Sequence, residues 1–164
     1  MIIEKEIIIN KGIDDAWNVI GVQFADAYKW ATPVNHSEGS GEGINGSACS
    51  ERGCSTTLGK LKERILEYDS EKFIISWQAV EGMPSMVKFA KNTWVLISVD
   101  NRKTKVKMKM DVEVGGIMGF LFQPMMKMQM NNLGNALISD FKYYVEYGRP
   151  SAKKIKTMNR HNRK

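Results

Sequence analysis

The sequence predicts an α+β protein in which a curved antiparallel sheet of about six or seven strands wraps around one long C-terminal helix. Two short helices are expected after the first strand. Three observations support this class: Val106 to Val114 alternates apolar and charged residues, residues 115–147 carry apolar residues at helical spacing, and short strand-like segments joined by turns precede them. A sheet with one dry face and a long apolar helix are expected to bury those surfaces against each other.

The N-terminal segment predicts one strand followed by helix. Glu4 to Ile9 alternates loosely, which is typical of a strand. Apolar residues then recur at helical spacing, at Ile13, Trp17, Ile20 and Phe24. Gly21 is expected to break this segment into two short helices, of which the second ends near Trp30.

Residues 37–46 form a glycine-rich stretch that predicts a flexible turn between two short strands. A phosphate-binding loop is the alternative. That alternative is disfavoured because no Lys-Ser or Lys-Thr pair follows and no helix begins there to direct its amides at a phosphate.

Four further strands are predicted as two hairpins. Leu58 to Tyr68 and Phe73 to Ala79 are joined by the short connection 69–71. Trp94 to Val99 is expected to pair with Val106 to Val114.

The last helix is predicted from Pro124 to Tyr147, a length of about 36 Å at 1.5 Å per residue. Pro124 suits the first turn, where its missing N–H has no partner, and Gly148 supplies the stop. The glycine-containing segment Gly115–Gln123 before it is expected to be a mobile gate.

Composition and charge indicate a soluble, cytoplasmic protein of one domain. The 164 residues suffice for one core, no apolar run is long enough to span a membrane, and the N-terminus lacks the features of a signal peptide. Cys49 and Cys54 make no metal-ligand pattern and are expected to be reduced thiols. No metal or cofactor is expected, and the oligomeric state is left between a monomer and a homodimer.

The net charge of +6 belongs to the C-terminal tail. Residues 149–164 hold seven bases and no acid, which leaves 17 bases against 18 acids in the rest of the chain, a net charge of −1. The tail is expected to be disordered, and weak attraction to nucleic acid or an anionic membrane is the alternative.

Four short motifs appear in the order found in a known superfamily. They are Trp17 with Phe24, Trp30 and Pro33; Gly46-Ser47-Ala48-Cys49; Gly59 to Asp69, with Glu63-Arg64 at its centre; and Lys142 to Gly148. Together they resemble the START/Bet v 1-like (SRPBCC) superfamily, nearest its polyketide cyclase/dehydrase-like branch. The resemblance covers about residues 2–148.

The resemblance implies a helix-grip domain over residues 1–148, in which the long C-terminal helix closes a hydrophobic pocket against the sheet. It implies little about function, because the fold hosts carriers, cyclases, co-chaperone domains and hormone receptors. One departure matters: Cys49 stands where the family often has Arg, so an acidic ligand anchored by an arginine at that position is not expected.

Methionine and aromatic residues are the candidates for the pocket wall. A Met-lined space adapts to varied apolar guests, although each methionine taken alone fits a packed core equally well. The predicted wall comprises Trp30, Trp77, Met83, Met86, Phe89, Trp94, Met108, Met110, Phe122, Met126, Met130 and Leu133.

Polar candidates are few. Glu63 is a weak catalytic candidate: facing inward it would be a tuned base, whereas facing outward it would pair with a cross-strand lysine. Asp140 lies in the apolar sector of the last helix but near its end, where it could reach solvent or a loop N–H. With two distant histidines the chain offers no Ser-His-Asp arrangement.

The leading hypothesis is binding, sequestration or transport of a hydrophobic or amphipathic small molecule, such as a lipid, a polyketide-like aromatic or a quinone. A cyclase/dehydratase-type enzyme acting in the same cavity is the second hypothesis. A protein-interaction domain whose basic tail contacts nucleic acid or membrane is the third.

Overall fold

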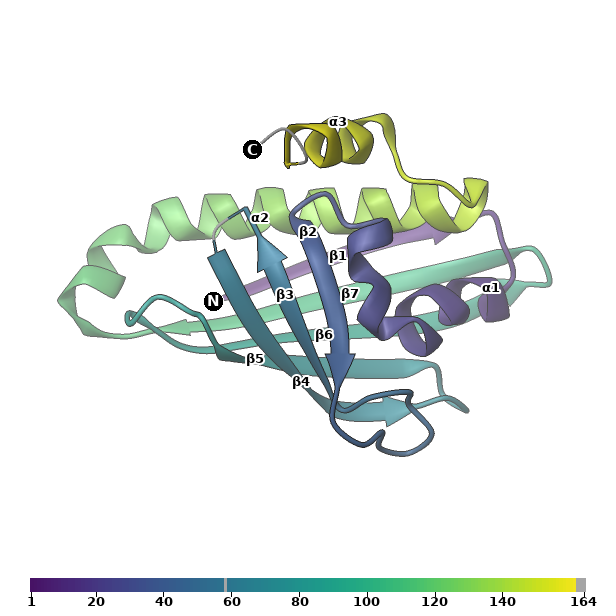
Figure 1. Ribbon diagram of the computed structural model, residues 1–164, viewed down its shortest axis with the longest axis horizontal. Helices are drawn as coiled ribbons and strands as arrows, with labels where there is room; N and C mark the ends of the chain where they lie inside the picture. Colours follow the sequence, from purple (N-terminus) through teal and green to yellow (C-terminus); the bar gives the residue numbers. More distant parts are fainter. Residues whose placement is uncertain (58, 162–164) are drawn as a thin grey trace.

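Seven antiparallel strands form one curved sheet, and a 32-residue helix lies along its inner side in the computed structural model (Figure 1). The structure describes residues 1–57 and 59–161. In chain order the elements are β1 (Ile2–Ile9), α1 (Ile13–Trp17), η1 (Asn18–Val22), η2 (Phe24–Lys29), β2 (Val34–Ser40), β3 (Glu51–Thr56), β4 (Gly59–Asp69), β5 (Ile74–Glu81), β6 (Val87–Asp100), β7 (Lys103–Val114), α2 (Gly116–Tyr147) and α3 (Ala152–His161). The predicted α+β class and helix-grip arrangement are confirmed.

The sheet has the strand order β1-β7-β6-β5-β4-β3-β2, so the two strands that flank the short helices are its two edges. β1 pairs with β7 along its whole length, from Ile2 opposite Asp111 to Ile9 opposite Thr104. The amino group of Met1 extends this ladder by donating to the Val112 carbonyl at 2.6 Å. Segments α1, η1 and η2 therefore bridge from one edge of the sheet to the other.

Most strand boundaries differ from the sequence prediction by one to three residues, and two differences are larger. β6 begins at Val87 rather than Trp94, because residues 87–93 pair with the second half of β7. The first four residues of the glycine-rich stretch 37–46 belong to β2, which pairs with β3. The predicted strand start at Leu58 lies outside the described residues.

The short helical region does not break at Gly21. Gly21 lies inside the π-helical turn η1, where a Cβ would stand 2.5 Å from the Trp17 ring. The change of direction falls at Gln23, between η1 and η2. Gly21 is thus a site of close packing against an aromatic ring, which its helix-breaking tendency did not reveal.

Helix α2 begins at Gly116, so Pro124 lies inside the helix and not in its first turn. A proline inside a helix has no N–H for the carbonyl one turn before it and bends the axis, and α2 bends near its N-terminal end in Figure 1. The predicted stop is confirmed: Gly148 has φ +66° and donates its N–H to the Tyr144 carbonyl at 2.8 Å.

The two halves of α2 lie in different environments. In the second half Ile138, Phe141 and Val145 are buried in the core. Gly134 allows the helix to approach the sheet closely, since a Cβ there would lie 3.1 Å from Met108 Cε. In the first half most side chains are exposed, including Ile117, Phe120 and Leu121.

Residues 152–161 form helix α3, contrary to the disordered tail predicted for residues 149–164. Lys154 is fully buried and donates to the Val34 carbonyl at the start of β2, and its N–H is bound by Ser151 Oγ at 3.2 Å. Composition did not predict this contact, because nothing distinguishes Lys154 from the six other bases of residues 149–164 in the sequence. Residues 162–164 of the predicted tail lie outside the described residues.

Candidate ligand-binding surface

Apolar side chains that are only partly covered lie on the first half of α2 and on the inner face of the sheet. On α2, Met126 shares one side of the helix with Met130 and Leu133, which both pack against the core. On the sheet, the partly exposed apolar residues of inner parity are Leu61, Ala79 and Ala90. We call these residues, together with Phe122, the inner apolar surface. The main contacts of α2 are with β1 and β7, at the other side of the sheet from β3 and β4.

The three tryptophans of the predicted wall lie deeper, in a closed aromatic cluster. Trp94 is fully buried and packs edge-on against Phe141 of α2, with ring centroids 5.0 Å apart. Trp30 contacts Trp94 and Phe141 at 6.3 and 5.5 Å, and Trp77 stacks beside Trp94 at 6.5 Å. Met108 and Met110 are buried on the inner face of β7. These five predicted residues therefore form core beside the inner apolar surface.

Glu63 faces inward and belongs to a buried polar cluster. Its Oε2 accepts hydrogen bonds from Arg52 Nε at 2.8 Å and Nη2 at 2.5 Å, and its Oε1 accepts from Trp77 Nε1 at 2.9 Å. Arg52 also donates to the Phe24 carbonyl at 2.6 Å and stacks 4.1 Å above the Phe24 ring. The outward alternative, pairing with a lysine, is wrong: the partner is Arg52, directly opposite Glu63 in the β3–β4 ladder.

The electrostatics of this cluster are those of a fixed ion pair. Burial tends to lower the pKa of Arg52, but the Glu63 carboxylate outweighs it and raises that pKa. Burial raises the pKa of the nearby Cys54 thiol to about 12, against the opposing field of Arg52. A neutral thiol and a carboxylate already bound on both oxygens offer neither a nucleophile nor a free base.

Two buried polar atoms on β6 have no hydrogen-bond partner among the described residues: Asn92 Oδ1 and Trp94 Nε1. Asn92 lies opposite Trp77 and Met110 in the ladders, at the boundary between the aromatic cluster and the inner apolar surface. Both atoms are enclosed by the described chain, and an enclosed polar atom without a partner costs free energy, so these are the two positions in the wall where a polar partner would be stabilising.

The remaining wall candidates lie around the β5–β6 connection. Met83 and Met86 are in its loop, and the Met86 carbonyl accepts the Gly115 N–H at 2.9 Å, which holds the loop beside the start of α2. Phe89 lies opposite Glu113, on the outer parity of the sheet. Met83 and Phe89 line an open hollow of about 350 Å³ together with Ala79 and Ala90 of the inner apolar surface.

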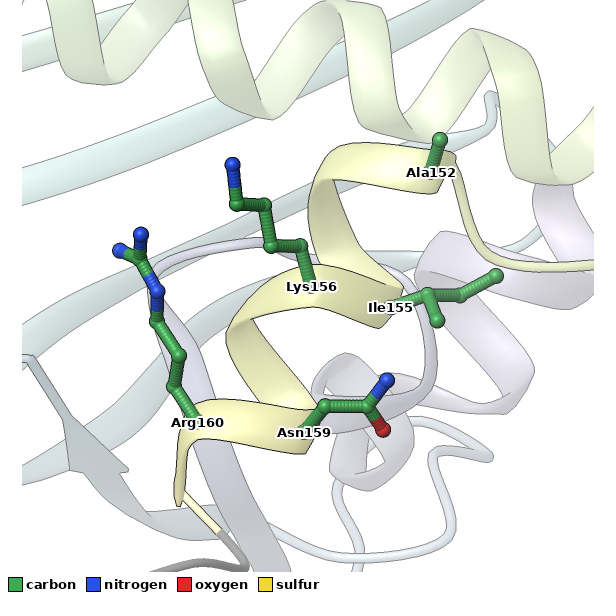
Figure 2. A pocket seen from close by; sticks show the side chains of 5 residues that line it. All are labelled: Ala152, Ile155, Lys156, Asn159 and Arg160. Atoms are coloured by element: carbon green, nitrogen blue, oxygen red, sulfur yellow. The ribbon is translucent and has the colours of Figure 1, made fainter.

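A second hollow of about 350 Å³ lies on the outer side of α3, away from every predicted wall residue. Lys156 and Arg160 extend on one side of the helix there, and Ile155 and Asn159 on the other (Figure 2). It is a shallow basic surface of the C-terminal helix.

Asp140 has a structural role. Its Oδ2 accepts the Thr32 N–H at 2.8 Å and its Oδ1 accepts the Ser151 hydroxyl at 3.0 Å. Asp140 thereby ties α2 both to the loop after Trp30 and to the start of α3. Of the two alternatives that the sequence left open for Asp140, solvent and a loop N–H, the structure shows the loop N–H, together with a bond to Ser151 that was not predicted.

Sequence reasoning missed two residues of the site, Arg52 and Asn92, and one structural residue outside it, Lys154. Arg52 could have been found, since the β3–β4 hairpin register places it opposite Glu63. Asn92 shares parity with Trp94, but nothing in its sequence context marks a polar position facing inward. Nothing in the sequence distinguishes Lys154 from the other bases of the C-terminal segment.

Within residues 1–57 and 59–161 no group of three or more His, Cys, Asp or Glu side chains is placed to hold a metal ion. No helix in the same part of the chain is long and apolar enough to cross a membrane.

The fold and the inner apolar surface define a START-like helix-grip protein. The START superfamily protein from Mycobacterium smegmatis has a similar structure, with a TM-score of 0.72 and 14% identity over 88% of this chain and 97% of that one. The chain belongs to the family described as "Polyketide cyclase / dehydrase and lipid transport", whose model matches residues 2–146.

Two further solved structures share the fold. The di-domain ARO/CYC BexL from the BE-7585A biosynthetic pathway matches with a TM-score of 0.73 and 16% identity over 89% of this chain and 46% of that one. Norcoclaurine synthase from Thalictrum flavum, solved with dopamine and hydroxybenzaldehyde, matches with a TM-score of 0.68 and 15% identity over 88% of this chain and 86% of that one. No curated protein sequence matches the chain significantly.

Proposed function

We propose that this protein binds a hydrophobic or amphipathic small molecule between the first half of α2 and the inner face of β4–β6, and sequesters or transports it. The observation that carries the proposal is the inner apolar surface. Met126 and Met130 on the helix, and Ala79 and Ala90 on the sheet, are apolar and only partly covered by the described chain. Apolar area of this kind favours association with an apolar guest.

The polar groups of the site favour a neutral head group over an acidic one. Arg52, the buried cation, is neutralised by Glu63, so it offers no free charge for a carboxylate. Of the two unpaired atoms, Asn92 Oδ1 lies on a half-buried residue and can accept from a hydroxyl once the wall opens, whereas Trp94 Nε1 is enclosed in the aromatic cluster. A lipid alcohol, a quinone or a polyketide-like aromatic fits this chemistry.

Binding is favoured over the cyclase/dehydratase alternative. Catalysis by Glu63 would require a carboxylate free to take a proton, but both oxygens of Glu63 are held by Arg52 and Trp77. The proposed location is the cytoplasm, since the chain carries two free cysteines, both buried.

The test compares two neighbouring methionines that lie on different sides of α2. Met126→Trp is expected to fill the space over the inner apolar surface and to weaken binding of the neutral probe N-phenyl-1-naphthylamine about tenfold. Met125→Trp, at a more exposed position, is the matched control and is expected to bind like the wild type. The measurement is a fluorescence titration.

Native mass spectrometry of the protein purified from cells supplies a second readout. The wild type is expected to retain a small molecule that Met126→Trp has lost. Equal probe binding by both variants, with no retained mass in the wild type, would overturn the proposal.

A further inference from the structure

The first half of α2 carries a second apolar face, on the side opposite the inner apolar surface. With about 100° between successive residues, six residues fall on one side of the helix. They are Ile117, Phe120, Leu121, Pro124, Met125 and Met128, which we call the outer stripe. Met126 and Met130 fall on the opposite side.

The outer stripe is uncovered. Ile117 is 81% exposed and Phe120 77% exposed, and Leu121, Met125 and Met128 are also exposed. Further along the same side of α2 the residues are polar: Asn131, Asn132 and Asn135. The apolar character therefore stops where the helix passes over the body, although a helix that is apolar on all sides is normally buried on all sides.

The charge around the outer stripe is positive. From Gly115 to Ser139 the one ionisable side chain is Lys127, which is exposed at the flank of the stripe. Helix α3 presents the exposed bases Lys153, Lys156 and Arg160. In Figure 1, α3 and the outward side of α2 lie along the same edge of the molecule, and Figure 2 shows Lys156 and Arg160 extending from α3.

We propose that the outer stripe and α3 together form a docking surface for an anionic lipid membrane. The stripe inserts its apolar side chains at the boundary between head groups and acyl chains, and the bases of α3 bind the anionic head groups. A membrane is favoured over a second copy of the chain, because a second copy would bring like charges together along the stripe.

The position of the stripe gives docking a consequence for ligand exchange, which rests on the proposed function. One side of the same four helical turns faces the lipid and the other faces the inner apolar surface. A guest leaving the bilayer would cross a single helix, and Pro124 lies in this segment, where the helical hydrogen bonding is interrupted.

The test uses sedimentation with phosphatidylcholine vesicles prepared with and without phosphatidylglycerol. The wild type is expected to bind the anionic vesicles, and Phe120→Ser with Leu121→Ser is expected to reduce the partition coefficient at least about tenfold. Leu66→Ser with Val99→Ser, which removes two exposed apolar residues from the sheet, is the matched control and should bind normally. Lys156→Gln with Arg160→Gln should weaken binding to anionic vesicles alone.

Three outcomes would overturn the membrane surface. In the first, the wild type binds neither kind of vesicle. In the second, the stripe variant binds vesicles as well as its control does. In the third, the wild type is a dimer and the stripe variant is a monomer, but the two bind vesicles equally. The probe titration keeps the two proposals separate. A stripe variant that binds N-phenyl-1-naphthylamine normally but has lost vesicle binding supports the membrane surface, whereas failure of the wild type to bind the probe counts against the proposed function alone.

Discussion

Arg52 and Glu63 show how much a buried pair depends on both partners. Their side chains are 5% and 12% exposed, and Arg52 makes two bonds to Glu63 and one to the Phe24 carbonyl. Removing one charge from such a pair leaves the other buried without compensation, which costs more than the pair itself contributes.

Glu63→Gln is therefore expected to lower the free energy of unfolding by about 3 to 5 kcal/mol, measured by urea denaturation. The joint replacement Arg52→Met with Glu63→Leu is expected to cost less than Glu63→Gln, because no charge remains buried. Glu51→Gln is the control and should change stability far less, because the partners of Glu51 are the more exposed Lys62 and Arg64, at 35% and 56%, which water can solvate when the carboxylate is lost. A Glu63→Gln protein as stable as this control would contradict the account.

Lys154 gives the protein a pH dependence in the alkaline range. Burial lowers its pKa from 10.5 to about 8, against the opposing attraction of Asp140. The folded state therefore loses this proton more readily than the unfolded chain does. The contribution of Lys154 to the free energy of unfolding consequently increases as the pH rises from about 8 to 10.5. Below pH 8 both states hold the proton and the dependence vanishes.

The comparison of wild type with Lys154→Met isolates this effect. The difference in unfolding free energy between the two proteins is expected to move in favour of the wild type between pH 8 and 10.5. Thermal unfolding at a series of pH values measures it. A difference that stays constant across this range would show that Lys154 does not titrate there.

At the scale of elements, the two halves of α2 differ in how firmly they are held. Its second half is fixed by Ile138, Phe141 and Val145 in the core, whereas its first half is exposed and contains Pro124. The sequence prediction of a mobile gate over Gly115–Gln123 remains a prediction, now for a helical segment and not for a loop.

Hydrogen exchange tests that gate. Amides of residues 116–128 are expected to exchange faster than those of residues 134–147, because few buried contacts hold the first half in place. Pro124→Ala restores the missing N–H and is expected to slow exchange around residues 120–128, whereas Gln123→Ala leaves it unchanged. Uniform slow exchange along the whole helix in the wild type would remove the gate.

The start of α2 and the order of α3 could not be predicted for physical reasons. Pro124 is as compatible with a first helical turn as with an interior bend, and local sequence does not decide between them. The composition of residues 149–164 is typical of a solvated tail. Lys154 is buried because its ammonium group donates to the Val34 carbonyl, which is distant in sequence and cannot be inferred from local composition.

At the scale of the whole molecule, the sequence predicted the architecture well because its signals were periodic and local. The alternation in β7 and the helical spacing in α2 each depend on one segment, and both are confirmed. The site depended on side chains meeting across strands. Trp30, Trp77 and Trp94 all face inward, but they pack against one another and so belong to the core. The partly exposed surface beside them is formed by smaller residues such as Ala79 and Ala90.

The pairing of β1 with β7 has a consequence for the order of assembly during synthesis. β1 is synthesised before the other six strands of the sheet, yet its partner strand β7 is not complete until Val114 has been added. Ile3 and Ile9 must therefore stay exposed on the nascent chain while β2 to β6 pair in sequence order. Of the seven strands, the one that comes earliest in the chain is therefore among the last to pair.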